Sequence, residues 1–230
     1  MRKPLIGGLL ALGLSLSAVA APAVAAPVDT TSTVYKEVVA HLQADGVPEK
    51  QQEALAQKVL AGDKLDGGTP EKEPVKTQKW EDSKTEYVRE SFADGSYRLM
   101  SFEKGFKTIP GVAVPAGISG CIVTTGTGYQ SNTNCRVSES QATFQASFTA
   151  SYTFSGGVYG SISKATNGNV KGIGGLASSI STKVEKNRSD GRIPASAYVK
   201  WNYKAAGDIA GGTTYLYLKV TPKTAYTVVD

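Results

Sequence analysis

Residues 143–154 alternate without interruption between two kinds of side chain, and this pattern restricts the possible folds more than any other. Successive side chains of a β-strand point to opposite faces of the sheet, so alternation over this length predicts one long strand. One face is apolar and the other is rich in hydroxyls, which is typical of an antiparallel sheet with one face on a core and one in water. The apolar set is Phe144, Ala146, Phe148, Ala150, Tyr152 and Phe154, and the polar set is Thr143, Gln145, Ser147, Thr149, Ser151 and Thr153.

Further strands are predicted on both sides of this segment. The Asp94-Gly95 turn between residues 87–92 and 96–102 predicts a β-hairpin. Residues 155–175 contain seven glycines, which we expect to break regular structure and to leave a short strand at 158–162. Alternation also predicts strands at residues 176–185, 195–204 and 213–220. Many short strands with no long helix between them predict an antiparallel β-sandwich.

Two short helical patterns precede the strands. Val38 and Leu42 recur at helical spacing before Asp45-Gly46, and Leu55 and Val59 recur after Pro48, which suits a first helical turn. The complete fold prediction is therefore a mainly β chain, an antiparallel β-sandwich with a small N-terminal α-helical hairpin. The expected organisation is a helical hairpin at 26–62, a Gly- and Pro-containing linker at 63–79 and a sandwich domain at 80–230.

The first residues have the composition of a signal peptide. Arg2 and Lys3 are followed by an apolar stretch at 5–21 and by Ala23-Val24-Ala25, a small-residue cleavage site. Residues 1–25 are therefore predicted to be a signal peptide, and the mature chain is predicted to be secreted and extracellular. No later apolar run approaches the length of a membrane-spanning helix, so no transmembrane helix is expected.

The chain has two cysteines, Cys121 and Cys135, in a polar stretch at 120–136. In an exported chain such a pair predicts one disulfide, which would constrain the unfolded state by about 3 kcal/mol in the chain-entropy model. Its role is either to pin this loop or to present it to a partner with Tyr129 at the centre, as in a secreted inhibitor. With one histidine and no third thiol, neither a metal site nor a cofactor is expected.

Charge is distributed unevenly along the chain. Residues 28–107 hold 12 Lys and Arg against 15 Asp and Glu, whereas residues 141–230 hold 10 against 4. A basic second half is suited to an anionic surface, such as wall polymer or lipid headgroups, although ordinary surface lysines give the same balance. No Lys and Arg cluster of the nucleic-acid-binding type is present, so nucleic acid is not an expected partner.

The sequence offers little for catalysis. Its one histidine, His41, is predicted to lie half-exposed on the first helix, away from any cleft. Ser161 and Lys164 fit an S-x-x-K pattern, but enzymes that use it place the serine at a helix start, and glycines precede Ser161 here. An enzyme is therefore less expected than a non-catalytic protein.

Aromatic side chains provide the candidate binding residues. Trp201 shares an alternating face with Ala197 and Val199 and is predicted to point into the core, which places Tyr198 outward with Lys200. Trp80 is predicted to be exposed or to pin the linker to the sandwich. The side chains proposed for binding are Tyr129, Tyr198, Tyr215, Tyr217 and Lys219, because tyrosine offers a rigid contact surface with a polar tip and lysine offers positive charge.

A membrane-active or pore-forming protein is the alternative. Residues 143–154 are long enough to cross a bilayer as a strand, with residues 176–185 as the partner strand and the glycine-rich stretch as the tip. The tip holds Lys164 and Lys171 but no continuous apolar anchor.

The leader, the helical segment at 54–63 and the segment at 92–96 resemble those of uncharacterised secreted proteins of Gram-positive, actinobacterial-type bacteria. The resemblance implies export and a shared architecture, and it implies no activity. We therefore expect a secreted, non-catalytic binding or structural protein that acts at the cell surface or in the medium, on an anionic or glycan wall polymer.

Overall fold

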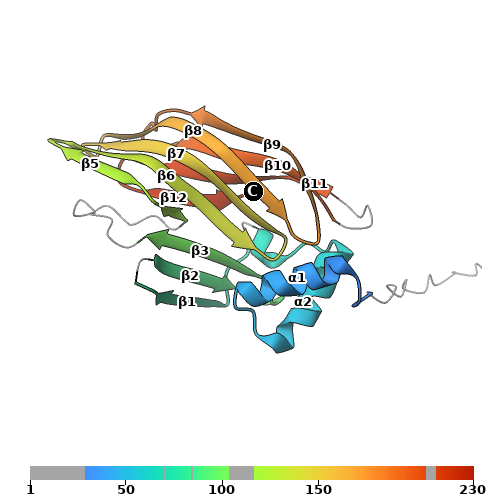
Figure 1. The fold of residues 1–230 in the computed structure, drawn as a ribbon. Helices are drawn as coiled ribbons and strands as arrows, with labels where there is room; N and C mark the ends of the chain where they lie inside the picture. Colours follow the sequence, from blue (N-terminus) through green and yellow to red (C-terminus); the bar gives the residue numbers. More distant parts are fainter. Residues whose placement is uncertain (1–28, 70, 84, 104–116, 206–210) are drawn as a thin grey trace, which may run out of the picture.

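The computed structural model describes residues 29–69, 71–83, 85–103, 117–205 and 211–230. It consists of two antiparallel sheets packed face to face, with two short helices at one end (Figure 1). The prediction of a mainly β sandwich with an N-terminal helical hairpin is confirmed. The predicted signal peptide at 1–25 lies outside the described residues. Within the described part of the chain, no helix is long and apolar enough to cross a membrane.

The helical hairpin consists of α1 (Thr33–Ala44) and α2 (Glu49–Ala61). The Ser32 hydroxyl caps α1 by accepting a hydrogen bond from the Tyr35 N–H, and α2 ends at Gly62 in the left-handed conformation that glycine adopts easily. The apolar stripes of both helices meet in a second core, which they share with Tyr97, Ala142 and Ile173 of the strand region. This core also includes Val38, Leu42, Leu55, Ala56 and Val59.

The segment predicted to be a linker contains regular structure. It holds the 3₁₀ turn η1 (Asp66–Gly68) and the start of β1 (Lys76–Glu81). Strand β1 pairs with β2 (Thr85–Ser91), which pairs with β3 (Tyr97–Glu103) across the predicted Asp94-Gly95 turn. All six residues of β1 are exposed, which explains why they carry no apolar pattern.

The first sheet is built around β6 (Tyr129–Gln141). One edge of β6 pairs with β7 (Phe144–Ser155), which is the strand predicted from the alternation. The other edge pairs in succession with β3, β4 (Ile118–Ser119) and β5 (Ile122–Gly126). Strand β7 then pairs with β8 (Tyr159–Gly172), which lies at one edge of this sheet, with β1 at the other end of the strand order.

The glycine-rich stretch was expected to break regular structure, and that prediction is wrong. All 14 residues of strand β8 come from this stretch, so the short strand expected at 158–162 is only the first part of a longer one. Its glycines allow close approach: a Cβ at Gly160 would collide with the Thr221 carbonyl, and one at Gly168 would collide with the Thr182 side chain. These contacts bring β8 against the second sheet. The neighbours of β7 are therefore β6 and β8, and not residues 176–185 as the pore-forming alternative requires.

The second sheet has the order β12-β11-β10-β9, with β9 (Gly175–Lys186), β10 (Ala195–Ala205), β11 (Gly211–Val220) and β12 (Ala225–Val229). Its inner face packs on β7, and Trp201 is fully buried against Phe144 as predicted, with ring centroids 4.8 Å apart. The main core also includes Phe148, Tyr152, Val199, Leu216 and Leu218.

Strand β9 does not keep one apolar face along its length. Ser179 has a positive φ of 53°, and the pairing with β10 shifts between Lys200 and Asn202. Such a bulge turns the residues on its two sides to different faces of the sheet. Ala177 and Val184 therefore pack on the core, whereas Leu176 is 66% exposed.

The predicted disulfide between Cys121 and Cys135 is present. It does not close an irregular loop, because most of the enclosed segment is the hairpin of β5 and β6. Cys135 is buried opposite Ala150 of β7, and Cys121 lies between β4 and β5. Tyr129 is the first residue of β6, at the end of this hairpin.

Candidate functional site on the second sheet

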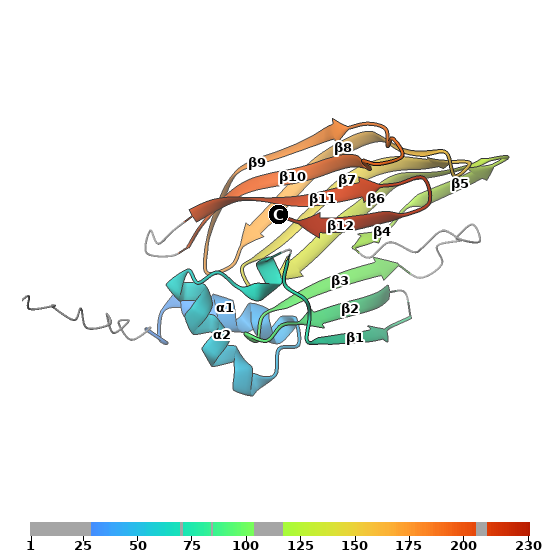
Figure 2. The same cartoon turned by 180° about the vertical axis from the view of Figure 1, so that it is seen from behind.

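Three of the predicted binding tyrosines lie together on the outer face of the second sheet, which faces the reader in Figure 2. Tyr198 of β10 lies directly opposite Tyr217 of β11, and Lys200 lies directly opposite Tyr215. Residues directly opposite each other in a sheet project from the same face. Their sequence neighbours project to the other face, where the main core lies.

The three phenol rings contact one another. Tyr215 and Tyr217 stack with centroids 5.4 Å apart and planes 14° apart. Tyr198 meets both rings edge to face, at 5.3 Å from Tyr215 and 5.6 Å from Tyr217. Both arrangements are favourable for aromatic rings. Each ring is half-buried by its neighbours, so the group presents a preformed aromatic surface.

Two lysines flank the rings. The Lys219 Nζ lies 3.9 Å from the centroid of Tyr217, and the Lys200 Nζ lies 5.8 Å from the centroid of Tyr215. Both distances are within the range of cation–π attraction. We call Tyr198, Tyr215, Tyr217, Lys200 and Lys219 the tyrosine platform.

The protonation states of the platform are set by burial and by nearby carboxylates. Burial raises the pKa of Tyr217 to about 12, and the charge of Glu185 adds to the effect. Its phenol is therefore a neutral hydrogen-bond donor under ordinary conditions. Burial also lowers the pKa of Lys219, while Glu185 and Asp230 act in the opposite direction. Glu185 in turn accepts a hydrogen bond of 2.8 Å from the Ser196 hydroxyl.

The structure brings together Tyr198, Tyr215, Tyr217 and Lys219, but it places Tyr129 elsewhere, at the end of the first sheet. Lys200 was not among the predicted binding residues, although this lysine shares the alternating face of Tyr198. Tyr226 was not among them either, and it lies opposite Lys219 on β12. The pairing of β11 with β12 identifies Tyr226, since no strand was predicted from the sequence for residues 225–229.

Trp80 does not pin the linker to the sandwich. It is exposed on β1 and stacks on Tyr87 of β2, with centroids 5.3 Å apart and planes 11° apart. The Trp80–Tyr87 pair lies on the first sheet and is not part of the tyrosine platform.

His41 was expected to be half-exposed, and the structure shows that it is buried. Its Nε2 lies 2.8 Å from the Gln141 carbonyl and 3.5 Å from an Asp45 carboxylate oxygen. The same carboxylate oxygen accepts hydrogen bonds from Tyr97 at 2.7 Å and Ser140 at 2.8 Å. This network joins α1 to the first sheet and lies in the interior, so His41 is part of the fold and is not presented to a substrate.

The position of the S-x-x-K motif in the fold does not support a catalytic role for Ser161 and Lys164. Ser161 and Lys164 lie within strand β8, whereas enzymes with this motif place the serine at the start of a helix. No group of three His, Cys, Asp or Glu residues that could hold a metal ion occurs among the described residues.

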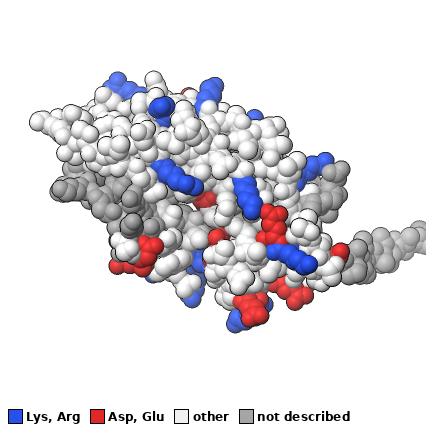
Figure 3. Space-filling view, viewed as in Figure 1, with Lys and Arg blue, Asp and Glu red and all other residues white. Residues whose placement is uncertain are grey.

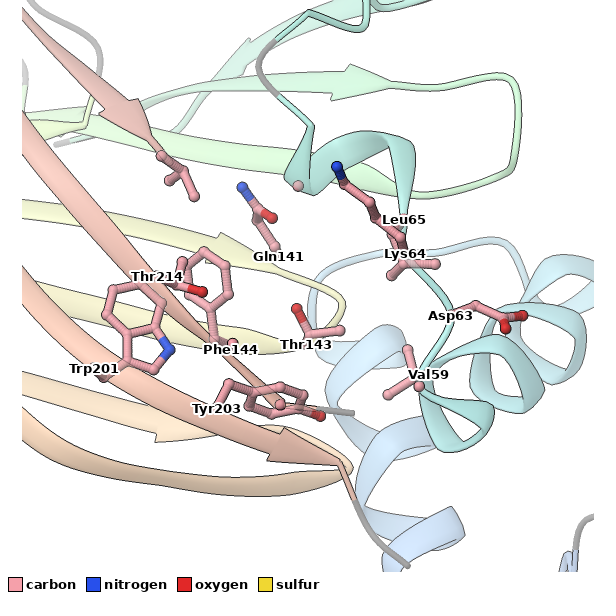
Figure 4. Close-up of a pocket in the computed structure, with 15 residues that line it drawn as sticks. Val59, Asp63, Lys64, Leu65, Gln141, Thr143, Phe144, Trp201, Tyr203 and Thr214 are labelled. Carbon is pink, nitrogen blue, oxygen red and sulfur yellow. The ribbon is translucent and has the colours of Figure 1, made fainter. Parts of the chain in front are cut away.

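A cavity of about 380 Å³ lies where the helical end meets the sandwich (Figure 4). Val59, Leu65, Phe144 and Tyr203 contribute to its walls. Trp201 also lines it, and the buried indole N–H has no hydrogen-bond partner among the described residues. None of the predicted binding residues lines this cavity.

Comparisons with known proteins give no family for this chain. No family model matches it, and no curated protein matches it. Among solved structures, the chain is similar to a hypothetical protein from Listeria monocytogenes EGD-e at 18% identity and a TM-score of 0.31. The match covers 64% of this chain and 94% of the Listeria chain.

Proposed function

We propose that this chain is a secreted, non-catalytic binding protein whose tyrosine platform holds a cell-surface polymer that carries both sugar rings and negative charge. The packing of three tyrosine rings between two lysines on an open sheet face is the observation that carries the proposal. The rings offer flat apolar surface to the C–H face of a sugar, and the phenol groups offer hydrogen bonds. Lys200 and Lys219 supply positive charge for an acidic group on the same polymer.

Preorganisation favours this use of the platform. Ordering flexible side chains at a binding surface costs free energy, and the platform rings already restrict one another before a ligand arrives. The charge distribution agrees with an anionic partner. Residues 141–230, which include both platform strands, hold 10 Lys and Arg against 4 Asp and Glu. On the opposite face of the molecule, which Figure 3 shows, most acidic side chains lie over the helices and β1–β3, whereas Lys and Arg side chains lie over the sandwich as well as over that part.

Secretion is part of the proposal and is supported by the predicted signal peptide at 1–25 and by the disulfide between Cys121 and Cys135. Disulfides persist in oxidising compartments outside the cytosol.

Co-sedimentation with purified Gram-positive cell walls tests the proposal. The mature chain, residues 26–230, should pellet with walls at about 50 mM NaCl and lose binding as salt rises to about 500 mM. Walls stripped of phosphate-linked polymer with hydrofluoric acid should retain less protein. A Tyr215→Ala/Tyr217→Ala variant should bind roughly tenfold more weakly, since aromatic contacts carry much of the affinity.

Trp80→Ala is the matched control, because it removes an exposed aromatic ring, itself stacked on a tyrosine, from the first sheet. It should pellet like the unmodified chain. Wall binding that survives the loss of both platform tyrosines would show that the platform is not the binding surface.

A further inference from the structure

Four turns gather at the end of the sandwich opposite the helices (Figures 1 and 2). The β5–β6 and β7–β8 turns are neighbours, because Tyr129 pairs with Ser155 and a Cβ on Gly156 would lie 3.3 Å from the Gly128 carbonyl oxygen. The β11–β12 turn adjoins them, since a Cβ on Gly157 would lie 3.7 Å from Lys223 Cε.

The β9–β10 turn joins the same end through backbone hydrogen bonds to the start of β8. The Ser189 N–H donates to the Gly160 carbonyl at 2.8 Å, and the Ile162 N–H donates to the Asn187 carbonyl at 2.8 Å. We call residues 127–129, 156–159, 187–194 and 221–224 together the turn end.

Three apolar side chains project from the turn end. Val158 is 74% exposed, Ile193 is 57% exposed and Tyr129 is 43% exposed, and each comes from a different turn. Single exposed apolar residues are ordinary on a soluble protein, whereas a group of them at one extremity is typical of an interaction site.

The charges of the turn end are mainly positive. Arg188, Arg192 and Lys223 are exposed, and Asp190 is the one acidic residue in these segments. Asp190 is engaged by Lys186 at 2.5 Å and by the Ile193 N–H at 2.9 Å. The Arg188 guanidinium lies 3.6 Å above the ring of Tyr159, which fixes its position at the surface.

We propose that the turn end docks on the surface of an anionic lipid bilayer without crossing it. Val158 and Ile193 would enter the boundary between headgroups and acyl chains, and Tyr129 would sit at the headgroup level. Arg188, Arg192 and Lys223 would contact the negatively charged headgroups. A hydrated polysaccharide offers no apolar layer for Val158 and Ile193, so a bilayer fits this extremity better.

This surface is separate from the tyrosine platform. The platform lies on the outer face of the second sheet, whereas the turn end lies at the extremity where the strands reverse. The two proposals can therefore fail independently.

Vesicle co-sedimentation tests the docking proposal. The mature chain should pellet with vesicles of phosphatidylglycerol and phosphatidylcholine and remain in solution with vesicles of phosphatidylcholine alone. Val158→Asp and Ile193→Asp should each weaken binding roughly tenfold, since each places a charge at the apolar boundary. Arg192→Gln and Lys223→Gln should each weaken it by roughly fivefold.

Leu176→Asp and Lys183→Gln are matched controls. Leu176 is 66% exposed near the helical end of β9, and Lys183 is exposed on the second sheet, so neither change should alter vesicle binding. Tyr215→Ala/Tyr217→Ala should also leave vesicle binding unchanged. Binding that is insensitive to Val158→Asp and Ile193→Asp would overturn the proposal. Release of a trapped dye by the unmodified chain would overturn it in favour of pore formation.

Discussion

Tyr198 and Tyr217 face each other across β10 and β11, and their rings meet edge to face with centroids 5.6 Å apart and planes 73° apart. Tyr215 contacts both rings, so the three tyrosines form one packed unit on the outside of the sheet. The fully buried side chains that hold the two strands lie on the opposite face, and they include Leu216 and Leu218. Binding and stability should therefore be separable at this site.

Tyr217→Phe and Tyr217→Ala make this separation measurable. Tyr217→Phe keeps the stacked ring and loses one hydroxyl, so wall binding should fall by a few-fold at most. Tyr217→Ala removes the ring from two aromatic contacts and from Lys219, so binding should fall roughly tenfold. The free energy of unfolding of both variants, measured in urea, should stay within about 1.5 kcal/mol of the value for the unmodified chain, because the ring is only half-buried. A platform that serves only stability would show the reverse, with unfolding changed and binding intact.

The buried Glu139 carboxyl makes stability depend on pH. Burial raises its pKa to about 7, although a hydrogen bond from the Gln141 amide and the charge of Arg98 act in the opposite direction. Since the folded chain holds this proton more tightly than the unfolded chain, Glu139 favours folding most at pH values below the ordinary pKa of 4.5. The free energy of unfolding should fall by about 3 kcal/mol as pH rises from there to about 7, and this contribution should then level off.

Glu139→Gln should remove this fall, because the amide does not ionise. Urea unfolding of both proteins between about pH 5 and pH 8 measures the difference. If the free energy of unfolding fell equally with pH in both proteins, Glu139 would not be the group responsible for the fall.

Asp45 should contribute strongly to the docking of the helical hairpin. Its carboxylate accepts hydrogen bonds from Tyr97 and Ser140, and its carbonyl accepts one of 2.7 Å from Arg89. Asp45→Ala would leave the buried Tyr97 hydroxyl without the carboxylate that accepts its hydrogen bond. We expect the free energy of unfolding, measured in urea, to fall by about 3 kcal/mol. Asp45→Asn keeps an acceptor oxygen and should lose less. Asp63→Ala, at an exposed position after α2, should change stability by no more than about 0.5 kcal/mol.

Long regular patterns in this sequence predicted structure well. The alternation at 143–154 gave β7 to within a residue at each end, and alternation at 195–204 placed Trp201 inside and Tyr198 outside. The tyrosine platform could be predicted for the same reason: strict alternation fixes the face of each side chain. The same alternation also places Lys200 on the outer face. Its membership of the platform became evident only from its cross-strand partner, Tyr215.

The failed predictions have specific physical causes. Glycines were interpreted as breaking structure, whereas Gly160 and Gly168 permit β8 to approach the second sheet. The bulge at Ser179 reverses the faces of β9 with no sequence signal that alternation can detect. The burial of His41 depends on Asp45, Tyr97 and Gln141, and the last two are distant in sequence, so local reasoning could not find that network.

Gly211 and Gly212 are adjacent at the start of β11, but their surroundings predict opposite responses to the same substitution. A Cβ at Gly211 would lie 2.5 Å from the Tyr203 carbonyl oxygen, so Gly211→Ala would force the β10–β11 pairing apart. A Cβ at Gly212 would meet no described atom within 4 Å. Gly212 lines the cavity together with Tyr203 and Thr214, which are labelled in Figure 4.

Gly212→Ala should therefore raise the free energy of unfolding by about 0.5–1 kcal/mol, chiefly because alanine reduces the freedom of the unfolded chain. Gly211→Ala should lower it by about 1–3 kcal/mol, because overpacking distorts the strand pair. Urea unfolding of the two variants in parallel tests both predictions. A general effect of replacing glycine in β11 would change the free energy of unfolding of both variants in the same direction. Equal changes in the two variants would show that a general effect of replacing glycine in β11 decides the response, and not the space around each added Cβ.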